Sequence, residues 1–118
     1  MFAYEKLEVY KRAFTLNQIV YRFLNENNSI PRYAKDQLGR ATLSIMLNIA
    51  EGSGKFSNRD RKNFYTTARG SAFECSSIIS FLSLESEIPE ALNIELVNLY
   101  EEVSRMLYAM IQNLSKEQ

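Results

Sequence analysis

The sequence predicts an all-α protein, an up-down-up-down antiparallel four-helix bundle that a single domain forms over residues 1–118. Four stretches carry apolar residues at alternating spacings of three and four, which is the repeat of a helix with a buried face. No stretch alternates at period two strongly enough to indicate a strand. The connections between the four stretches are short, and short connections place successive helices antiparallel to each other.

The first helix is expected to run from about Glu5 to Leu24. Its core-facing residues repeat at spacings of four and three: Val9, Ala13, Leu16, Val20 and Phe23. A second apolar stripe lies on a neighbouring face and consists of Leu7, Tyr10, Phe14 and Tyr21. This stripe has two interpretations. It widens the core face and leaves the tyrosine hydroxyls in water, or it forms an interface between subunits.

The second helix is expected to open at Pro31 and to end at Gly52, because proline suits a first helical turn and glycine can take a positive φ at the C-terminal cap. Between these residues the sequence is apolar over most of the helix circumference. Such a helix must be covered on more than one side. The side that carries Leu43 and Leu47 is therefore a second candidate for a subunit interface.

The third helix is expected to run from about Asn58 to Leu84, with Ser57 as its N-cap and Asp60 at the capping-box position. Its predicted core face consists of Phe64, Ala68, Ser71, Cys75, Ile78, Ile79 and Leu82. Another face carries Phe73, Phe81 and Leu84 beside the small residues Gly70 and Ser77. Small side chains let a neighbouring backbone come close, so this face is a second packing surface.

The fourth helix is expected to begin near Asn93, which can act as its N-cap after the break at Pro89. Its apolar residues fill one face: Leu96, Leu99, Tyr100, Val103, Met106, Leu107, Met110 and Leu114. The opposite face is polar. This helix therefore needs only one covered face.

Charge is balanced over the whole chain but not along it. Lys plus Arg and Asp plus Glu number 14 each, so no global attraction draws the protein to nucleic acid or to an anionic membrane. Residues 1–69 hold 12 basic and 6 acidic residues, whereas residues 70–118 hold 2 basic and 8 acidic residues. The two parts can attract each other or the neighbouring subunits.

The compartment is expected to be the cytoplasm. Cys75 is the single cysteine, so no intramolecular disulfide can form and a reducing environment is compatible. The N-terminus carries Glu5, Lys6 and Glu8 where a signal peptide needs an apolar run, and no charge-free stretch reaches the roughly 18 residues of a membrane-spanning helix. We expect no membrane partner.

Catalytic signals are largely missing. The sequence contains no histidine, which excludes Glu-x-x-His di-iron sites, Ser-His or Cys-His nucleophile pairs and histidine zinc ligands. The segment from Gly52 to Lys55 is similar to a phosphate loop, but Ile49 replaces the upstream glycine and Phe56 replaces the Ser or Thr that binds magnesium. We predict a protein that is not an enzyme and that uses no metal or cofactor.

A family resemblance rests on Arg40-Ala41, Asn48-Ile49-Ala50-Glu51-Gly52, Gly54-Lys55, Ser57, Phe64, Ala68-Arg69-Gly70-Ser71, Glu74 and the opening Tyr4-Glu5-Lys6-Leu7-Glu8-Val9-Tyr10. With the final amphipathic helix, this pattern resembles the four-helix-bundle family, also called the intervening-sequence protein family of bacterial 23S ribosomal RNA genes. The resemblance covers essentially the whole chain. It implies a small bundle that assembles into a ring, notably a pentamer. In a related branch, the accessory variability protein of diversity-generating retroelements, the ring binds nucleic acid and a reverse transcriptase, but that branch is strongly basic.

The family motif lies around the turn between the second and third helices and comprises Asn48, Glu51, Gly52, Gly54, Arg69, Gly70 and Glu74. We interpret it as a structural network in which Arg69 pairs with Glu51 or Glu74. The alternative is a carboxylate site, but two acids without a pocket, a metal ligand or a base define no reaction.

Positive charge concentrates at the start of the third helix, in Lys55, Arg59, Arg61, Lys62 and Arg69. Such charges together with free N–H groups of a helix start can contact phosphates, and Lys55, Arg59, Arg61 and Lys62 are the candidate contacts to RNA or DNA. A solvated basic face is the competing interpretation.

Two functions therefore remain open. The first is a homo-oligomeric scaffold or interaction module, with Leu7, Tyr10, Phe14, Tyr21, Leu43, Leu47, Phe73 and Phe81 as candidate interface residues. The second is a nucleic-acid-binding accessory factor that uses the basic residues from Lys55 to Arg69.

Overall fold

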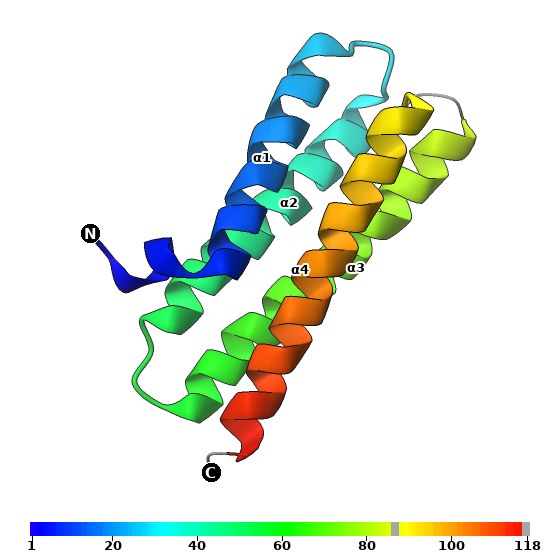
Figure 1. Ribbon diagram of the computed structural model, residues 1–118. Helices are drawn as coiled ribbons and strands as arrows, with labels where there is room; N and C mark the ends of the chain where they lie inside the picture. The colour runs from blue at the N-terminus through cyan, green and yellow to red at the C-terminus, as the bar shows by residue number, and fades with distance from the viewer. Residues whose placement is uncertain (86–87, 117–118) are drawn as a thin grey trace.

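Four α-helices and one short 3₁₀ helix form the protein in the computed structural model, which describes residues 1–85 and 88–116. The 3₁₀ helix η1 spans Ala3–Lys6, and helices α1, α2, α3 and α4 span Glu8–Glu26, Arg32–Ser53, Asn58–Leu84 and Glu90–Lys116. Successive α-helices run in opposite directions in Figure 1. Helices α1 and α3 each pack against α2 and α4, so the bundle is roughly square in cross-section. The predicted all-α bundle is confirmed.

The first helix is interrupted near its start, contrary to the prediction of one helix from Glu5. The carboxylate of Glu5 accepts the Phe2 N–H at 2.7 Å, which stabilises the isolated turn η1. Leu7 is then extended, with φ −73° and ψ 129°, and α1 begins at Glu8. The turn is fixed against α1 by the ring of Tyr4, which meets the edge of Tyr10 with centroids 4.7 Å apart.

Helix α2 continues through Gly52, so the prediction that Gly52 ends it with a positive φ was wrong. The cap residue is Gly54, whose φ of −87° lies in the right-handed helical region. Gly52 is buried for a different reason. A Cβ at this position would lie 2.8 Å from Cε1 of Tyr65 and 2.9 Å from Cβ of Phe64, so glycine lets α3 approach closely.

Helix α3 begins and ends as predicted, but its core face is turned slightly from the predicted one. Ser57 caps the helix by accepting the Asp60 N–H at 3.1 Å. The buried residues are Tyr65, Ala68, Ala72, Cys75, Ile79 and Leu82, whereas Phe64, Ser71 and Ile78 are half-buried. The shift follows from Gly52, because the space opposite that glycine takes the ring of Tyr65.

Helix α4 begins at Glu90, three residues before the predicted cap at Asn93. The Asn93 N–H donates to the carbonyl of Pro89 at 2.9 Å, which is the i to i−4 hydrogen bond of an α-helix, so Asn93 lies within the first turn and is not the cap. Proline lacks an N–H, and the first residues of a helix have no intrahelical partner for theirs, so a helix can begin directly after proline without loss.

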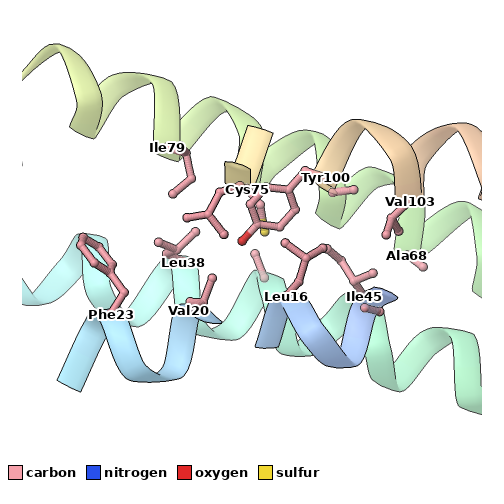
Figure 2. Close-up of a cluster of buried hydrophobic side chains, with 14 of the residues drawn as sticks. Leu16, Val20, Phe23, Leu38, Ile45, Ala68, Cys75, Ile79, Tyr100 and Val103 are labelled. Carbon is pink, nitrogen blue, oxygen red and sulfur yellow. The ribbon is translucent and has the colours of Figure 1, made fainter. Parts of the chain in front are cut away.

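The core runs along the bundle axis and receives side chains from all four α-helices (Figure 2). All five residues predicted for the core face of α1 are buried, and so are Leu96, Tyr100, Val103 and Leu107 of α4. Leu99, Met106, Met110 and Leu114 are partly buried at its margin. The three-and-four periodicity therefore identified the core faces of α1 and α4 correctly.

One buried polar residue, Thr42, connects all four α-helices at a single level. Its carbonyl accepts the amide of Asn17 on α1 at 2.9 Å, and its hydroxyl donates to the carbonyl of Leu38 at 2.8 Å. The same hydroxyl lies 2.7 Å from the hydroxyl of Tyr100 on α4 and 3.4 Å from the sulfur of Cys75 on α3. Figure 2 shows Cys75 and Tyr100 together in the middle of the core. Because every other buried side chain in the described core is apolar or aromatic, this contact fixes the register of the helices.

Candidate interaction surfaces

An apolar groove lies between α1 and α2 on the outside of the bundle. Phe14, Tyr21, Leu43 and Met46 line it, and its volume is about 420 Å³. Phe14, Tyr21, Leu43 and the neighbouring Leu47 are 44–71% exposed. We call these five residues the α1–α2 groove. The predicted stripe of α1 and the predicted side of α2 therefore form one surface rather than two.

Two further residues of the predicted stripe lie apart from this groove. Leu7 and Tyr10 are half-buried and pack against the core where η1 folds back onto α1. Burial raises the pKa of the Tyr10 hydroxyl, and the nearby Tyr4 and Glu5 raise it further. Their exposed area is small, so Leu7 and Tyr10 offer less to a partner than Phe14 and Tyr21.

A second apolar surface lies across α3 and α4 and is built around Arg69. The Arg69 guanidinium carbon lies 4.7 Å from the ring centroid of Phe73 and 5.4 Å from that of Tyr108. Both rings are more than half exposed, as is Phe81 two turns along α3. We call Arg69, Phe73 and Tyr108 the α3–α4 patch. Tyr108 was not predicted, although an aromatic residue outside the apolar stripe of α4 was a signal for it.

The α1–α2 groove and the α3–α4 patch lie on opposite sides of the bundle. Helix α1 packs against α2 and α4, and α3 packs against the same two helices, so α1 and α3 are diagonal to each other in the described bundle. The groove between the first pair therefore faces away from the patch between the second pair. One protein molecule can in this way offer two different surfaces to two neighbours.

Of the motif residues, only Asn48 belongs to the hydrogen-bonded group that lies between α2 and α3. The side-chain amide of Asn48 donates to the carbonyl of Ser44 at 2.8 Å and contacts its hydroxyl at 3.0 Å. Ser71 on α3 donates to the same hydroxyl at 3.0 Å. The Ser71–Ser44 bond joins α3 to α2, whereas the two Asn48 bonds lie within α2.

The charged residues of the motif are separated from each other. Glu74 accepts a hydrogen bond from Gln37, and Glu51 is exposed. Arg69 points toward α4, so its predicted pairing with Glu51 or Glu74 was wrong. Gly70 is exposed on α3, and a Cβ added there would meet no atom within 4 Å. No other described helix of the same chain therefore packs closely against Gly70.

The basic residues at the start of α3 lie at one end of the bundle. The ammonium of Lys55 lies 4.9 Å from the centroid of the Phe64 ring, and Arg61 donates through Nε to the carbonyl of Lys55 at 2.8 Å. Lys62 donates to the hydroxyl of Ser115 on α4 at 3.4 Å, while Arg59 is exposed. No acid pairs with Lys55, Arg59 or Arg61 in the described part of the chain.

The chemistry of the remaining candidate groups is restricted by burial. Burial raises the pKa of the Cys75 thiol from its ordinary value of 9.0 to about 11, so the reactive thiolate is scarce at neutral pH. The segment predicted to be similar to a phosphate loop is helical through Ser53. Within residues 1–85 and 88–116, no group of three or more acidic or cysteine side chains is placed to hold a metal ion.

Each described helix is too short or too polar over its length to cross a membrane. In a comparison with protein families, the sequence model described as "23S rRNA-intervening sequence protein" matches residues 5–109. This span contains α1, α2, α3 and most of α4, together with every residue of the groove and the patch. Comparison with curated proteins gives no match.

Proposed function

Since the chain belongs to the 23S rRNA-intervening sequence protein family, we propose that it is a non-enzymatic scaffold that assembles into a closed ring of identical subunits. Five subunits is the number that the resemblance favours. The observation that supports the proposal is the pair of unlike apolar surfaces on opposite sides of one bundle. Exposed apolar residues that are gathered on one surface often mark sites of protein–protein contact, and this chain carries two such groups of residues.

The chemistry of the two surfaces favours a head-to-tail contact. The α1–α2 groove is concave and apolar, whereas the α3–α4 patch presents two aromatic rings around an arginine. Aromatic residues and arginine carry much of the binding energy at protein interfaces, particularly when they enter a pocket. A contact between two different surfaces of identical subunits produces a ring when the rotation closes and a filament when it does not.

Light scattering on purified protein tests the assembly. The wild-type mass is expected to be a multiple of the 13.7 kDa chain mass, with five as the favoured factor. Phe14→Glu in the groove and Phe73→Glu in the patch should each release monomers that keep their helical circular dichroism. Phe56→Glu is the matched control, because Phe56 is fully exposed at the α2–α3 turn, away from both surfaces.

Mixing the two variants separates a head-to-tail contact from a two-fold one. Phe14→Glu keeps an intact patch and Phe73→Glu keeps an intact groove, so an equimolar mixture should form a dimer although each variant alone is monomeric. If the groove paired with a second groove, Phe73→Glu would still self-associate. A wild-type mass near that of one chain would reject the assembly itself.

We propose nucleic-acid binding at the basic end of the bundle as the second candidate function. Its support is the position of Lys55, Arg59 and Arg61 at the start of α3, where none of the three pairs with an acid in the described chain. In a cyclic ring every subunit places this end at the same distance from the axis, so the charge is repeated around one circle. Repetition of this kind raises the local positive potential although the net charge is zero.

A gel-shift titration over a range of salt concentrations tests this function with generic RNA and DNA. Phosphate contacts make log affinity fall with log salt by about 0.7–0.9 for each contact. The double variant Arg59→Glu, Lys62→Glu should abolish retention of the nucleic acid. The double variant Arg32→Glu, Lys35→Glu changes the net charge by the same amount at the other end of the bundle and should still bind the nucleic acid. Equal loss in both variants would show that only the overall charge matters and would reject a site at the start of α3.

A further inference from the structure

A cleft of about 380 Å³ opens at the end of the bundle where the chain begins. It lies between the end of η1 and three helix ends: the last residues of α2, the first two turns of α3 and the last turns of α4. The residues that matter for its chemistry are Leu7, Arg61, Tyr65, Met110, Asn113 and Leu114. Its volume falls within the range of roughly 300–1,000 Å³ that is usual for small-molecule sites.

The cleft exists because α1 is shorter at this end than its neighbours. The chain is extended at Leu7, so α1 begins only at Glu8 and η1 turns aside. Figure 1 shows the lower parts of α2, α3 and α4 continuing past the start of α1, and of the described helices η1 packs there against α1 and α2 only. The bundle core is thus left open on one side at the level of Tyr65 and Met110.

Two polar residues of α3, Arg61 and Tyr65, border the cleft and do not hydrogen-bond to each other. Arg61 is positioned by the bond from its Nε to the Lys55 carbonyl, which leaves its terminal guanidinium nitrogens available, and no described carboxylate pairs with it. Tyr65 is only 4% exposed as a residue, but its hydroxyl is not among the buried unpaired polar atoms, so it reaches solvent in the cleft, and it makes no hydrogen bond to another described residue. A tyrosine hydroxyl without an internal partner can donate a hydrogen bond to a ligand in the cleft.

The charge environment of Tyr65 fits a donor role. Burial raises the pKa of the Tyr65 hydroxyl, and the positive charge of Arg61 nearby opposes that rise. The hydroxyl is therefore protonated at neutral pH and can donate to an anion that Arg61 attracts. The lining of the cleft also contains the apolar side chains of Leu7, Met110 and Leu114, and Asn113 adds an amide.

We propose that this cleft binds a small carboxylic acid with an apolar body. The carboxylate accepts hydrogen bonds from the terminal nitrogens of Arg61 and from the hydroxyl of Tyr65, and the apolar body lies against Leu7, Met110 and Leu114. One cation and one neutral donor match the charge of a monocarboxylate, whereas a phosphate dianion would need more positive charge. The site lies within one chain, so it is independent of the proposed ring.

Isothermal calorimetry with octanoate as the probe tests the site, with 1-octanol as the neutral comparator of equal chain length. Octanoate is expected to bind saturably with one site per chain, and 1-octanol at least about tenfold more weakly, because it lacks the charge that Arg61 recognises. Arg61→Gln should weaken octanoate binding by about tenfold or more. Tyr65→Phe should weaken it by several-fold without altering the shape of the core.

Arg59→Gln is the matched control, since it removes an arginine from the same helical turn without touching the cleft. It should leave octanoate affinity unchanged, and circular dichroism should show the same helix content in all variants. Absence of saturable octanoate binding would overturn the proposal, as would equal effects of Arg59→Gln and Arg61→Gln. Equal binding of octanol and octanoate would reject carboxylate recognition and leave only an apolar site.

Discussion

The hydrogen bond between Thr42 and Tyr100 can be measured as a coupling between two helices. Thr42→Val removes the hydroxyl that lies 2.7 Å from that of Tyr100, which is itself only 1% exposed. A buried hydroxyl left without its partner lowers the free energy of unfolding by about 1–3 kcal/mol. Tyr100→Phe removes the other side of the bond and leaves Thr42 still donating to the Leu38 carbonyl, so its expected loss is smaller, about 0.5–1.5 kcal/mol.

The double variant Thr42→Val, Tyr100→Phe should lose less than the sum of the two single losses. Neither partner then remains as an unpaired hydroxyl in the core, and replacement of both by apolar groups of similar shape is close to neutral. We expect a coupling free energy of about 1 kcal/mol, which is well above the deviation of about 0.3–0.5 kcal/mol seen for independent sites.

Urea unfolding followed by far-UV circular dichroism at one fixed protein concentration measures these free energies, because assembly makes stability depend on concentration. Thr67→Val is the control. Thr67 makes the same hydroxyl-to-carbonyl bond one turn back, to Asn63 at 3.0 Å, but is exposed, so its loss should stay within about 0.5 kcal/mol. Additive losses from Thr42→Val and Tyr100→Phe would refute the idea that this contact links α2 to α4.

Three further predictions concern the core and the turn. Burial raises the pKa of the Cys75 thiol to about 11, so the folded protein holds this proton more tightly than the unfolded chain does. The resulting contribution to the free energy of unfolding is fully present below pH 9, and up to about 2–3 kcal/mol of it is lost as the pH rises from 9 to about 11. Cys75→Ala should reduce this loss in urea unfolding at high pH. Gly52→Ala should lower the free energy of unfolding by about 1–3 kcal/mol because its Cβ would press against Tyr65, whereas Gly70→Ala should raise it by about 0.5–1 kcal/mol, and thermal unfolding of the two variants compares them directly. Ser57→Ala should cost about 1 kcal/mol in the same measurement through loss of the α3 cap, and an unchanged melting temperature would contradict that role.

Periodicity predicted the buried face of a helix well wherever one face alone meets the core. Helix α1 shows this, because Val9, Ala13 and Leu16 follow the repeat and are buried as expected. The register of α3 was harder to predict, since Phe64 and Tyr65 are both aromatic and adjacent. Which of the two rings is buried depends on Gly52, a residue of another helix that leaves room for one ring. Sequence spacing within α3 contains no information about that space.

The candidate sites were predicted in part. The apolar residues outside the core were identified from their spacing, but their union into one α1–α2 groove depends on how two helices are placed side by side. Arg69 was expected to seek an acid, yet it lies between the rings of Phe73 and Tyr108. The cleft beside Arg61 and Tyr65 follows from the break at Leu7, and the helical pattern of residues 5–24 gave no sign of that break.

The position of the single thiol makes this chain its own probe of native-state opening. Cys75 is fully buried between Thr42 and Tyr100, so a thiol reagent reaches its sulfur only after α2, α3 and α4 separate at that level. When closing is fast relative to the chemical reaction, the labelling rate reports the equilibrium population of open molecules. Wild-type protein therefore carries a reporter of core opening that needs no engineered residue, and the same reporter compares the free subunit with any assembly it forms.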